Sequence, residues 1–348
     1  MDELQMIGAA LAEEPSERSA AAGRDRLVRE IHRPARRVRR LTWPLTGLGA
    51  VVAVVAAVAV LPGGTAPQGP AGPAPTARTV LLSVASKAER APAAKGRYWS
   101  VVRQERMLVT AGGHAFDTFK QIGLWDAGPG REAWIAHRDL GRRDLGPAPA
   151  GGPVVVGPRG APARGDAGPT EWTRTRVKGG EAYRLADWEG ITAPDVRRLP
   201  AEPAALKRFL DDALERTTKA NGPGFRIEPG EWLFGNIQKI GTAPVPPRVL
   251  GAAYRMLAAD PGLRVIGPVT DPLGRRGTAI ARPTPGADTE ERLVIDASSG
   301  RLLALETVLI KPGPDWKGFK AGDRVSYDAV VSYGWTDTVP EYRPAETG

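Results

Sequence analysis

The stretch ERLVIDASSGRLLALETVLI, from Glu291 to Ile310, predicts a β-hairpin. Its two ends are runs rich in Leu, Val and Ile, which favour strands. The residues between the runs suit a turn, because Asp296 can open it and Gly300 can adopt a positive φ. Two strands joined by so short a turn pair antiparallel, so the sequence predicts an antiparallel sheet at this point of the chain.

Further strands are predicted on both sides of this hairpin. The stretch LRVIGPVTDPLGRRGTAIAR (263–282) holds two β-forming runs around a turn with Asp271, Pro272 and Gly274. The stretch DRVSYDAVVSYGWTD (323–337) alternates in polarity and predicts a last strand. Nearer the N-terminus, β-forming runs cover residues 97–109, 115–125, 131–140 and 171–177.

Helices are predicted between these two groups of strands. Residues 203–217 place five apolar side chains at helical spacing: Leu206, Phe209, Leu210, Ala213 and Leu214. Residues 231–240 and 247–259 continue the helical pattern, and residues 79–90 form an earlier helix. The fold class that follows is α+β, with a curved antiparallel sheet packed on helices in a domain of residues 78–348. Residues 141–169, dense in Gly, Pro and Ala, predict a mobile surface insertion.

A membrane anchor is predicted before this domain. Residues 41–61 carry no charge, and a helix of that length spans about 31 Å, close to the hydrocarbon thickness of a bilayer. The charged residues directly before it are Arg36, Arg37, Arg39 and Arg40, Trp43 stands at the interface, and no charge follows until Arg78. The positive-inside rule then places residues 1–40 in the cytoplasm as a tail and residues 78–348 outside the cell membrane, after a Pro/Gly linker at 62–77. A cleaved signal peptide and a buried core helix are the alternatives.

Two features of the N-terminal region point to protein partners. Gly49, Ala53 and Ala57 recur at a spacing of four, which could let two membrane helices pack closely, although a segment rich in Ala and Val produces such a triple easily. Residues 1–32 are predicted to form two short helices, and the tail that contains them is too short to fold alone. They could become ordered on a cytoplasmic partner, lie on the anionic inner leaflet, or remain solvated.

Composition restricts the chemistry. The chain of 348 residues has a net charge of +9 and no cysteine. The absence of cysteine excludes disulfides, thiol nucleophiles, iron–sulfur clusters and cysteine-based zinc sites. The positive charge is spread along the chain without a dense basic stretch that includes aromatic residues, so we expect no nucleic-acid partner.

Candidate site residues are few. No nucleophile elbow, metalloprotease, P-loop or dinucleotide-binding motif is present, so we expect a protein that is not an enzyme and has no cofactor. His114 and His137, with Asp117 or Asp139, form only a weak candidate for a metal site, and ordinary surface histidines are the preferred interpretation.

Three tryptophans form the main candidate site. Trp99, Trp125 and Trp134 fall on successive predicted strands and could line an apolar groove for a lipid or peptide. The alternative is that these side chains fill the core.

Several stretches carry a resemblance to a known family: MDELQMIGAAL, LPAEPAALKRFL, PPRVLGAAYRMLAADPGLRVIGPVTDPLGRRGTAI and the opening hairpin. Together with the arginines before one membrane helix, they make the chain similar to uncharacterised single-pass membrane proteins of actinobacteria. The resemblance covers residues 1 to about 333 and supplies no catalytic residues. It implies an extracytoplasmic domain similar to the half-barrel of lipoprotein carriers and of periplasmic regulators that bind anti-sigma factors.

Two functional hypotheses follow from this resemblance and from the layout. In the first, the chain is an envelope sensor or regulator whose tail, residues 1–32, binds a sigma-factor-like partner. The layout resembles that of anti-sigma factors, without the His and Cys ligands of the zinc type. In the second, the chain is a lipid-binding or hydrophobic-ligand-binding envelope protein.

Overall fold

The computed structural model describes residues 75–111, 114–147, 169–180, 182, 196–222, 224–313, 316 and 318–344. All of these residues belong to one compact unit, residues 73–348. The predicted tail, the membrane segment and nearly all of the linker lie outside the described residues, and so do Arg36, Arg37, Arg39, Arg40, Trp43, Gly49, Ala53 and Ala57. Among the described residues, no helix is long and apolar enough to cross a membrane.

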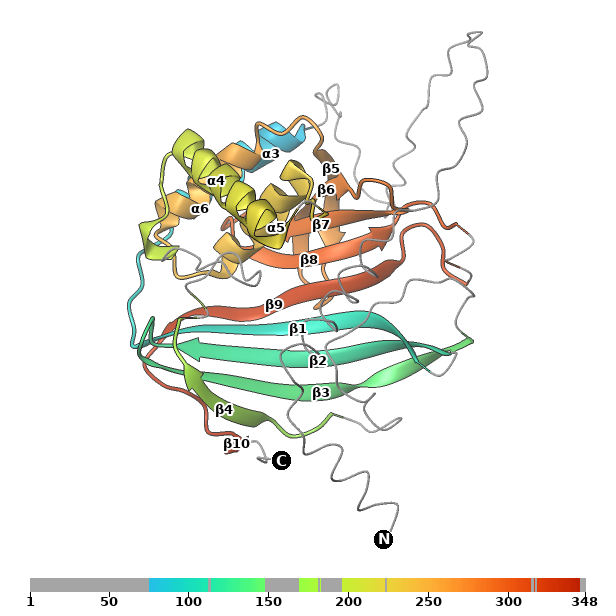
Figure 1. The fold of residues 1–348 in the computed structure, drawn as a ribbon, viewed down its shortest axis with the longest axis horizontal. Helices are drawn as coiled ribbons and strands as arrows, with labels where there is room; N and C mark the ends of the chain where they lie inside the picture. The colour runs from blue at the N-terminus through green and yellow to red at the C-terminus, as the bar shows by residue number, and fades with distance from the viewer. Residues whose placement is uncertain are drawn as a thin grey trace, which may run out of the picture. The chain divides into compact units, whose positions relative to one another are not determined.

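A single sheet of ten strands forms the frame of this unit, in the order β10-β4-β3-β2-β1-β9-β8-β7-β6-β5 (Figure 1). Every neighbouring pair is antiparallel except β10 and β4. The strands are β1 (Tyr98–Ala111), β2 (His114–Asp126), β3 (Glu132–Pro147), β4 (Thr173–Lys178), β5 (Arg264–Thr270), β6 (Arg276–Pro283), β7 (Thr289–Ile295), β8 (Leu302–Leu309), β9 (Arg324–Thr336) and β10 (Arg343–Pro344). The predicted α+β class, with a mostly antiparallel sheet and helices, is confirmed.

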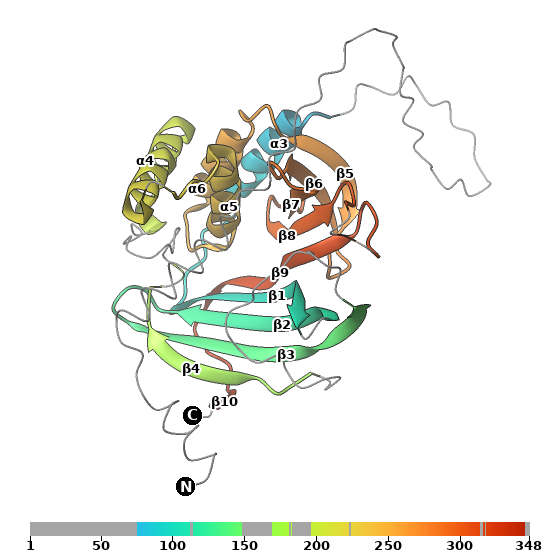
Figure 2. The ribbon, with the colours of Figure 1, turned by 45° about the vertical axis from the view of Figure 1, so that its right-hand side comes forward.

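Four α-helices gather over the half of the sheet that contains β5–β8, as Figures 1 and 2 show. They are α3 (Ala77–Glu89), α4 (Pro203–Asn221), α5 (Pro229–Thr242) and α6 (Pro247–Leu257), and a short 3₁₀ turn, η2 (Val196–Arg198), precedes α4. Helices α4, α5 and α6 each begin with a proline, whose missing N–H needs no partner in the first turn. The carboxylates of Glu202 and Glu228 accept hydrogen bonds from the first free backbone N–H groups of α4 and α5.

Side chains alternate between the two faces of the sheet. The face toward the helices, called here the helix face, buries Leu293 and Ile295 of β7 together with Trp99 of β1. The opposite face, called here the far face, buries smaller side chains, among them Ala304 and Ala329, which are partners in the β8–β9 register. The alternation follows from the period of two in a strand.

The β7–β8 turn is the point at which the sheet meets α3. Gly300 has φ 74°, and a Cβ at this position would lie 2.6 Å from the Val84 carbonyl oxygen and 3.0 Å from the Ala88 nitrogen. The hydroxyl of the fully buried Tyr254, from α6, donates to the Gly300 carbonyl over 3.0 Å. The glycine that was predicted for the turn therefore also permits the close approach of α3.

The predicted hairpins are confirmed at both turns, and one element needs correction. The stretch 141–169 was expected to be a mobile insertion, but β3 continues to Pro147 and pairs with β2 up to His114. Glycine does not end the strand because Gly141 and Gly146, with φ of 105° and 92°, accompany irregularities of the β2–β3 register. Residues 148–168 lie outside the described residues.

Candidate functional site

An apolar pocket with a cavity volume of about 510 Å³ opens on the helix face. It lies between the chain that follows α3, the connection from α5 to α6, the β7–β8 turn and the end of β9. The large apolar side chains in its wall are Trp99, Ile240, Val245, Leu250, Tyr333 and Trp335. The volume is within the range of about 300–1,000 Å³ that small-molecule sites occupy.

Aromatic side chains from two central strands form the rigid wall of this pocket. Trp99 of β1 and Trp335 of β9 are paired in register, and their rings meet edge to face with centroids 5.4 Å apart. The Trp99 ring also contacts Tyr333, 5.9 Å away, and its Nε1–H donates to the Thr242 carbonyl over 2.8 Å. The indole N–H is thereby satisfied, so Trp99 presents apolar ring surface to the pocket.

The opposite wall has few groups that need water. It is made of Ala91, Pro92, Ala93 and Ala94 after α3, and of residues 243–247 between α5 and α6, of which three are proline. Proline has no N–H, so a wall rich in proline leaves few backbone donors unpaired. Both the small side chains and the prolines therefore favour an apolar occupant.

A single cation lies at the rim of the pocket among its lining residues. The Arg301 guanidinium stacks on the Tyr333 ring at 4.1 Å and donates to the Tyr333 carbonyl over 3.0 Å. Burial raises the pKa of the Tyr333 hydroxyl, so this residue is a neutral phenol at physiological pH. The pocket thus combines an apolar interior with one positive charge at its edge.

The predicted groove of three tryptophans is corrected by the register. Trp125 is paired with Ser100 and with Trp134, whereas Trp99 is paired with Asp126. Trp99 therefore lies on the helix face, while Trp125 and Trp134 lie on the far face with Tyr98.

The far-face tryptophans belong to a cluster that the end of the chain covers. The Trp172 ring stacks on Tyr342, with centroids 5.0 Å apart, and the Arg174 guanidinium lies 4.6 Å from the centroid of the Trp134 ring. These rings contact protein and do not line the apolar pocket.

The two histidines are separated along the sheet. His114 lies 3.3 Å from the carboxylate of Asp144, and His137 lies 3.2 Å from the Thr173 hydroxyl. Within the described ranges, no group of three or more metal-ligating side chains occurs, so these residues are not brought together as a site.

Tyr333 and Trp335 are the site residues that sequence reasoning missed. They stand two positions apart in the last predicted strand, which places them on one face of it. That signal was available, but the sequence did not show that β9 pairs with β1.

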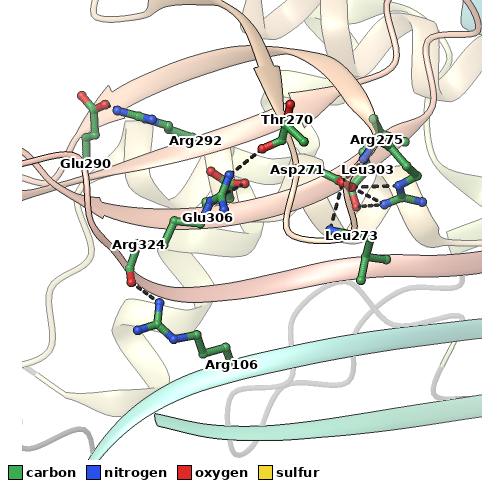
Figure 3. A network of polar contacts seen from close by, with 10 residues as sticks. All are labelled: Arg106, Thr270, Asp271, Leu273, Arg275, Glu290, Arg292, Leu303, Glu306 and Arg324. Atoms are coloured by element: carbon green, nitrogen blue, oxygen red, sulfur yellow. Dashed lines mark hydrogen bonds and ion pairs between the residues drawn. The ribbon is translucent and has the colours of Figure 1, made fainter. Parts of the chain in front are cut away.

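The far face carries a network of buried carboxylates and arginines, part of which Figure 3 shows. Asp117, Asp271, Glu290 and Glu306 are each buried, and each is paired with at least one arginine. Glu306 is the least well matched of the four. Its Oε1 atom lies 3.0 Å from Arg324 Nε without making a hydrogen bond. Burial raises the pKa of the Glu306 carboxyl above its ordinary 4.5, against the opposing attraction of Arg324.

The stability of the Glu306→Gln variant relative to that of the native protein is expected to increase as the pH rises. A carboxyl group whose pKa is raised on folding stabilises the folded state when protonated, and this contribution is lost as the pH rises from 4.5 through the raised value. Glutamine is neutral throughout, so its advantage over the native residue should grow across that window. Urea unfolding of the full chain in maltoside micelles between pH 4 and pH 8 measures this, with the exposed Glu171→Gln as control. A constant difference across the window would contradict the expectation.

Comparison with known proteins adds no family assignment, because no family model matches the sequence and a search of curated proteins finds no significant match.

Proposed function

We propose that this protein is a non-enzymatic, single-pass membrane protein whose C-terminal unit binds an apolar ligand in the helix-face pocket. The observation that carries the proposal is the pocket itself, with the ring wall of Trp99, Tyr333 and Trp335 facing a wall of alanine and proline. This arrangement favours the hydrophobic-ligand hypothesis and supplies the first step that an envelope sensor needs.

The ligand that fits best is an acyl chain or an apolar peptide segment with an anionic end. The interior offers ring and aliphatic surface, and burying that surface drives binding by about 25 cal/mol per Å². Arg301 at the rim could pair with a carboxylate or phosphate at the end of the chain.

The proposed membrane anchor would keep this pocket close to the bilayer. Helix α3, whose C-terminal end reaches the pocket, begins at Ala77, and the apolar run ends at Leu61. Residues 62–76 reach at most about 50 Å when fully extended. An extracytoplasmic domain on such a tether would encounter lipids of the outer leaflet, which supports a lipid as the occupant.

The regulatory part of the proposal concerns residues 1–32. A ligand that binds one state of the extracytoplasmic domain better than another shifts the population of the two states. Within this proposal, the cytoplasmic tail transmits that shift to a sigma-factor-like partner. The tail has no catalytic motif, so holding and releasing a protein partner is the function assigned to it.

Ala93→Trp is expected to block the pocket with little effect on stability. Ala93 is exposed and lines the mouth, so an indole there should exclude the ligand without disturbing the core. Membranes that contain the full chain are exposed to a diazirine fatty acid and irradiated, and labelled peptides are mapped by mass spectrometry. In the native chain, labels should fall on residues 91–94, 243–250 and 333–335. In the Ala93→Trp variant, the extent of labelling at these residues should decrease to the level that the native chain shows with excess unlabelled fatty acid.

Ala287→Trp is the matched control, because Ala287 is an exposed alanine in the β6–β7 turn. It should label as the native chain does. Labelling confined to residues 41–61, or labelling of the pocket peptides that Ala93→Trp leaves unchanged, would contradict the proposal.

A further inference from the structure

The far face carries a second pocket, of about 630 Å³, whose wall is rich in arginine. Its lining includes Arg106 of β1, Arg143 of β3, Arg292 of β7, and Arg324 and Tyr327 of β9. Figure 3 shows Arg106 and Arg324 on the neighbouring strands β1 and β9, and Arg292 on β7, which β8 separates from β9. The pocket is separate from the apolar one, which opens on the helix face.

Buried carboxylates hold these arginines in place. Asp117 has no exposed surface and binds two guanidinium groups, that of Arg106 through Nε at 2.8 Å and that of Arg143. Arg106 also donates to the carbonyl of Arg324, which ties the two arginines together. Each guanidinium group is thus fixed on one side, and its remaining donors are directed by that contact.

The balance of charge around the pocket is positive. Glu290 binds Arg264 and Arg292, and Glu306 pairs with Arg324. With Arg106 and Arg143 on Asp117, five guanidinium groups face three buried carboxylates. Asp323, which also lines the pocket, leaves an excess of one positive charge.

Several donors of these arginines remain available. Within the part of the chain that the structure describes, Arg292 makes a hydrogen bond only through Nε, to Glu290 over 2.7 Å, so its two terminal NH₂ groups are available. Among the described residues, Arg143 makes a hydrogen bond only through one NH₂ group, to Asp117, and its side chain is 64% exposed. An arginine side chain has five N–H donors and no acceptor, so the N–H groups without a protein partner can donate only to an acceptor on a bound ligand or to water.

A relay of amide groups determines what Tyr327 offers to the pocket. Arg138 Nε donates to Gln121 Oε1 over 2.9 Å, Gln121 Nε2 donates to Gln104 Oε1 over 3.2 Å, and Gln104 Nε2 donates to the Tyr327 hydroxyl over 3.0 Å. The relay runs in one direction because arginine can only donate, which fixes the orientation of each amide in turn. The Tyr327 oxygen is therefore the acceptor, and its own proton is free to be donated into the pocket.

We propose that this pocket binds a phosphate group, presented either by a lipid headgroup or by free phosphate. Guanidinium groups on four strands and one phenolic O–H converge on the same space, and all of them are donors. A tetrahedral anion with several equivalent oxygens accepts hydrogen bonds from such different directions, and arginine suits phosphate in charge and geometry. The volume exceeds that of phosphate itself, which leaves room for the group that carries it.

Calorimetry on the full chain in dodecyl maltoside tests the proposal. The probes are inorganic phosphate and dihexanoyl phosphatidic acid, with dihexanoyl glycerol as the uncharged control. Binding of the phosphatidic acid alone identifies a lipid headgroup, and binding of inorganic phosphate identifies free phosphate as sufficient. Tyr327→Phe, Arg143→Gln and Arg292→Gln should each weaken binding about tenfold, since each removes a hydrogen bond to a charged group. Arg216→Gln, an exposed arginine of α4, should leave binding unchanged.

Gln121→Glu tests the relay. A carboxylate at this position accepts hydrogen bonds from both Arg138 and Gln104. The Gln104 amide must then turn its NH₂ group toward residue 121 and its oxygen toward Tyr327. That oxygen accepts the hydrogen bond from the Tyr327 hydroxyl, whose proton is no longer available to the pocket. Gln121→Glu should weaken phosphate binding about as much as Tyr327→Phe does, by about tenfold. The double variant should bind no more weakly than either single variant. Additive losses would overturn the role of the relay.

A purely structural role for the arginines gives a different result. In that case neither probe binds the native chain, or Arg143→Gln and Tyr327→Phe bind as the native chain does, and the proposal is overturned. Arg143 is largely exposed, and Asp117 keeps its contact with Arg106 in the Arg143→Gln variant, so we expect this variant to fold.

Discussion

Asp126→Ala is expected to lower the free energy of unfolding by about 3–6 kcal/mol, because it leaves three backbone donors unpaired. The Asp126 carboxylate has no exposed surface. It accepts hydrogen bonds from the backbone N–H groups of Gly128 at 2.7 Å, Gly180 at 2.9 Å and Ala182 at 3.0 Å. Alanine removes the acceptor and keeps the three donors in the interior. Urea unfolding of the full chain measures the loss.

Two variants make this prediction specific. Asp126→Asn keeps one oxygen as an acceptor but places an amide NH₂ group against a backbone N–H. Its free energy of unfolding should therefore lie between those of the native protein and of Asp126→Ala. Asp139→Ala removes an exposed carboxylate and should change stability by less than about 0.5 kcal/mol. If Asp126→Ala were as mild as Asp139→Ala, the carboxylate would not be what joins the end of β2 to Gly180 and Ala182.

Gly300→Ala is the second change with a large expected effect, a loss of about 3 kcal/mol or more. The residue adopts φ 74°, which strains any L-residue by about 1–2 kcal/mol. The added Cβ would also lie 2.6 Å from the Val84 carbonyl oxygen, so α3 would have to move. Because backbone on both sides makes the contact, no flexible side chain can relieve it.

Gly274→Ala isolates the contribution of that contact. Gly274 has φ 82° in the β5–β6 turn, and a Cβ there would meet nothing within 4 Å. It should lose only the conformational part, about 1–2 kcal/mol. The difference between the two variants in thermal or urea unfolding is then the effect of the contact with α3. Equal losses of stability in the two variants would show that α3 moves away from the added Cβ at no energetic cost.

The local elements could be predicted from the sequence because their signals are local. Asp296 and Gly300 mark the hairpin turn, and Asp271 to Gly274 mark the next one, so both hairpins have the expected bounds within a few residues. The helix of residues 203–217 was expected from its apolar spacing, and α4 contains it. Turn chemistry and helical period depend only on residues close in sequence.

The site could not be predicted in the same way because it depends on pairing between distant strands. Trp99 was expected beside Trp125, and both lie on adjacent strands, but a shift of one residue in register places them on opposite faces. The residues that do join Trp99 are Tyr333 and Trp335, which belong to the far end of the chain. The arginine network of the far face gave no signal in the sequence, because its ion pairs connect seven strands.

The pairing of β1 with β9 at the middle of the sheet has a consequence for how the protein reaches its native state. The Ser100 hydroxyl donates to the Gly334 carbonyl, 234 positions later in the chain. The centre of the sheet therefore closes only after synthesis has passed β9, whose last residue is Thr336. This step is expected to be slow, since chain entropy is lost before a contact between such distant strands forms. Until β9 arrives, β1 presents an unpaired edge that can pair with other chains, so this polypeptide should depend on holdase chaperones during its biogenesis.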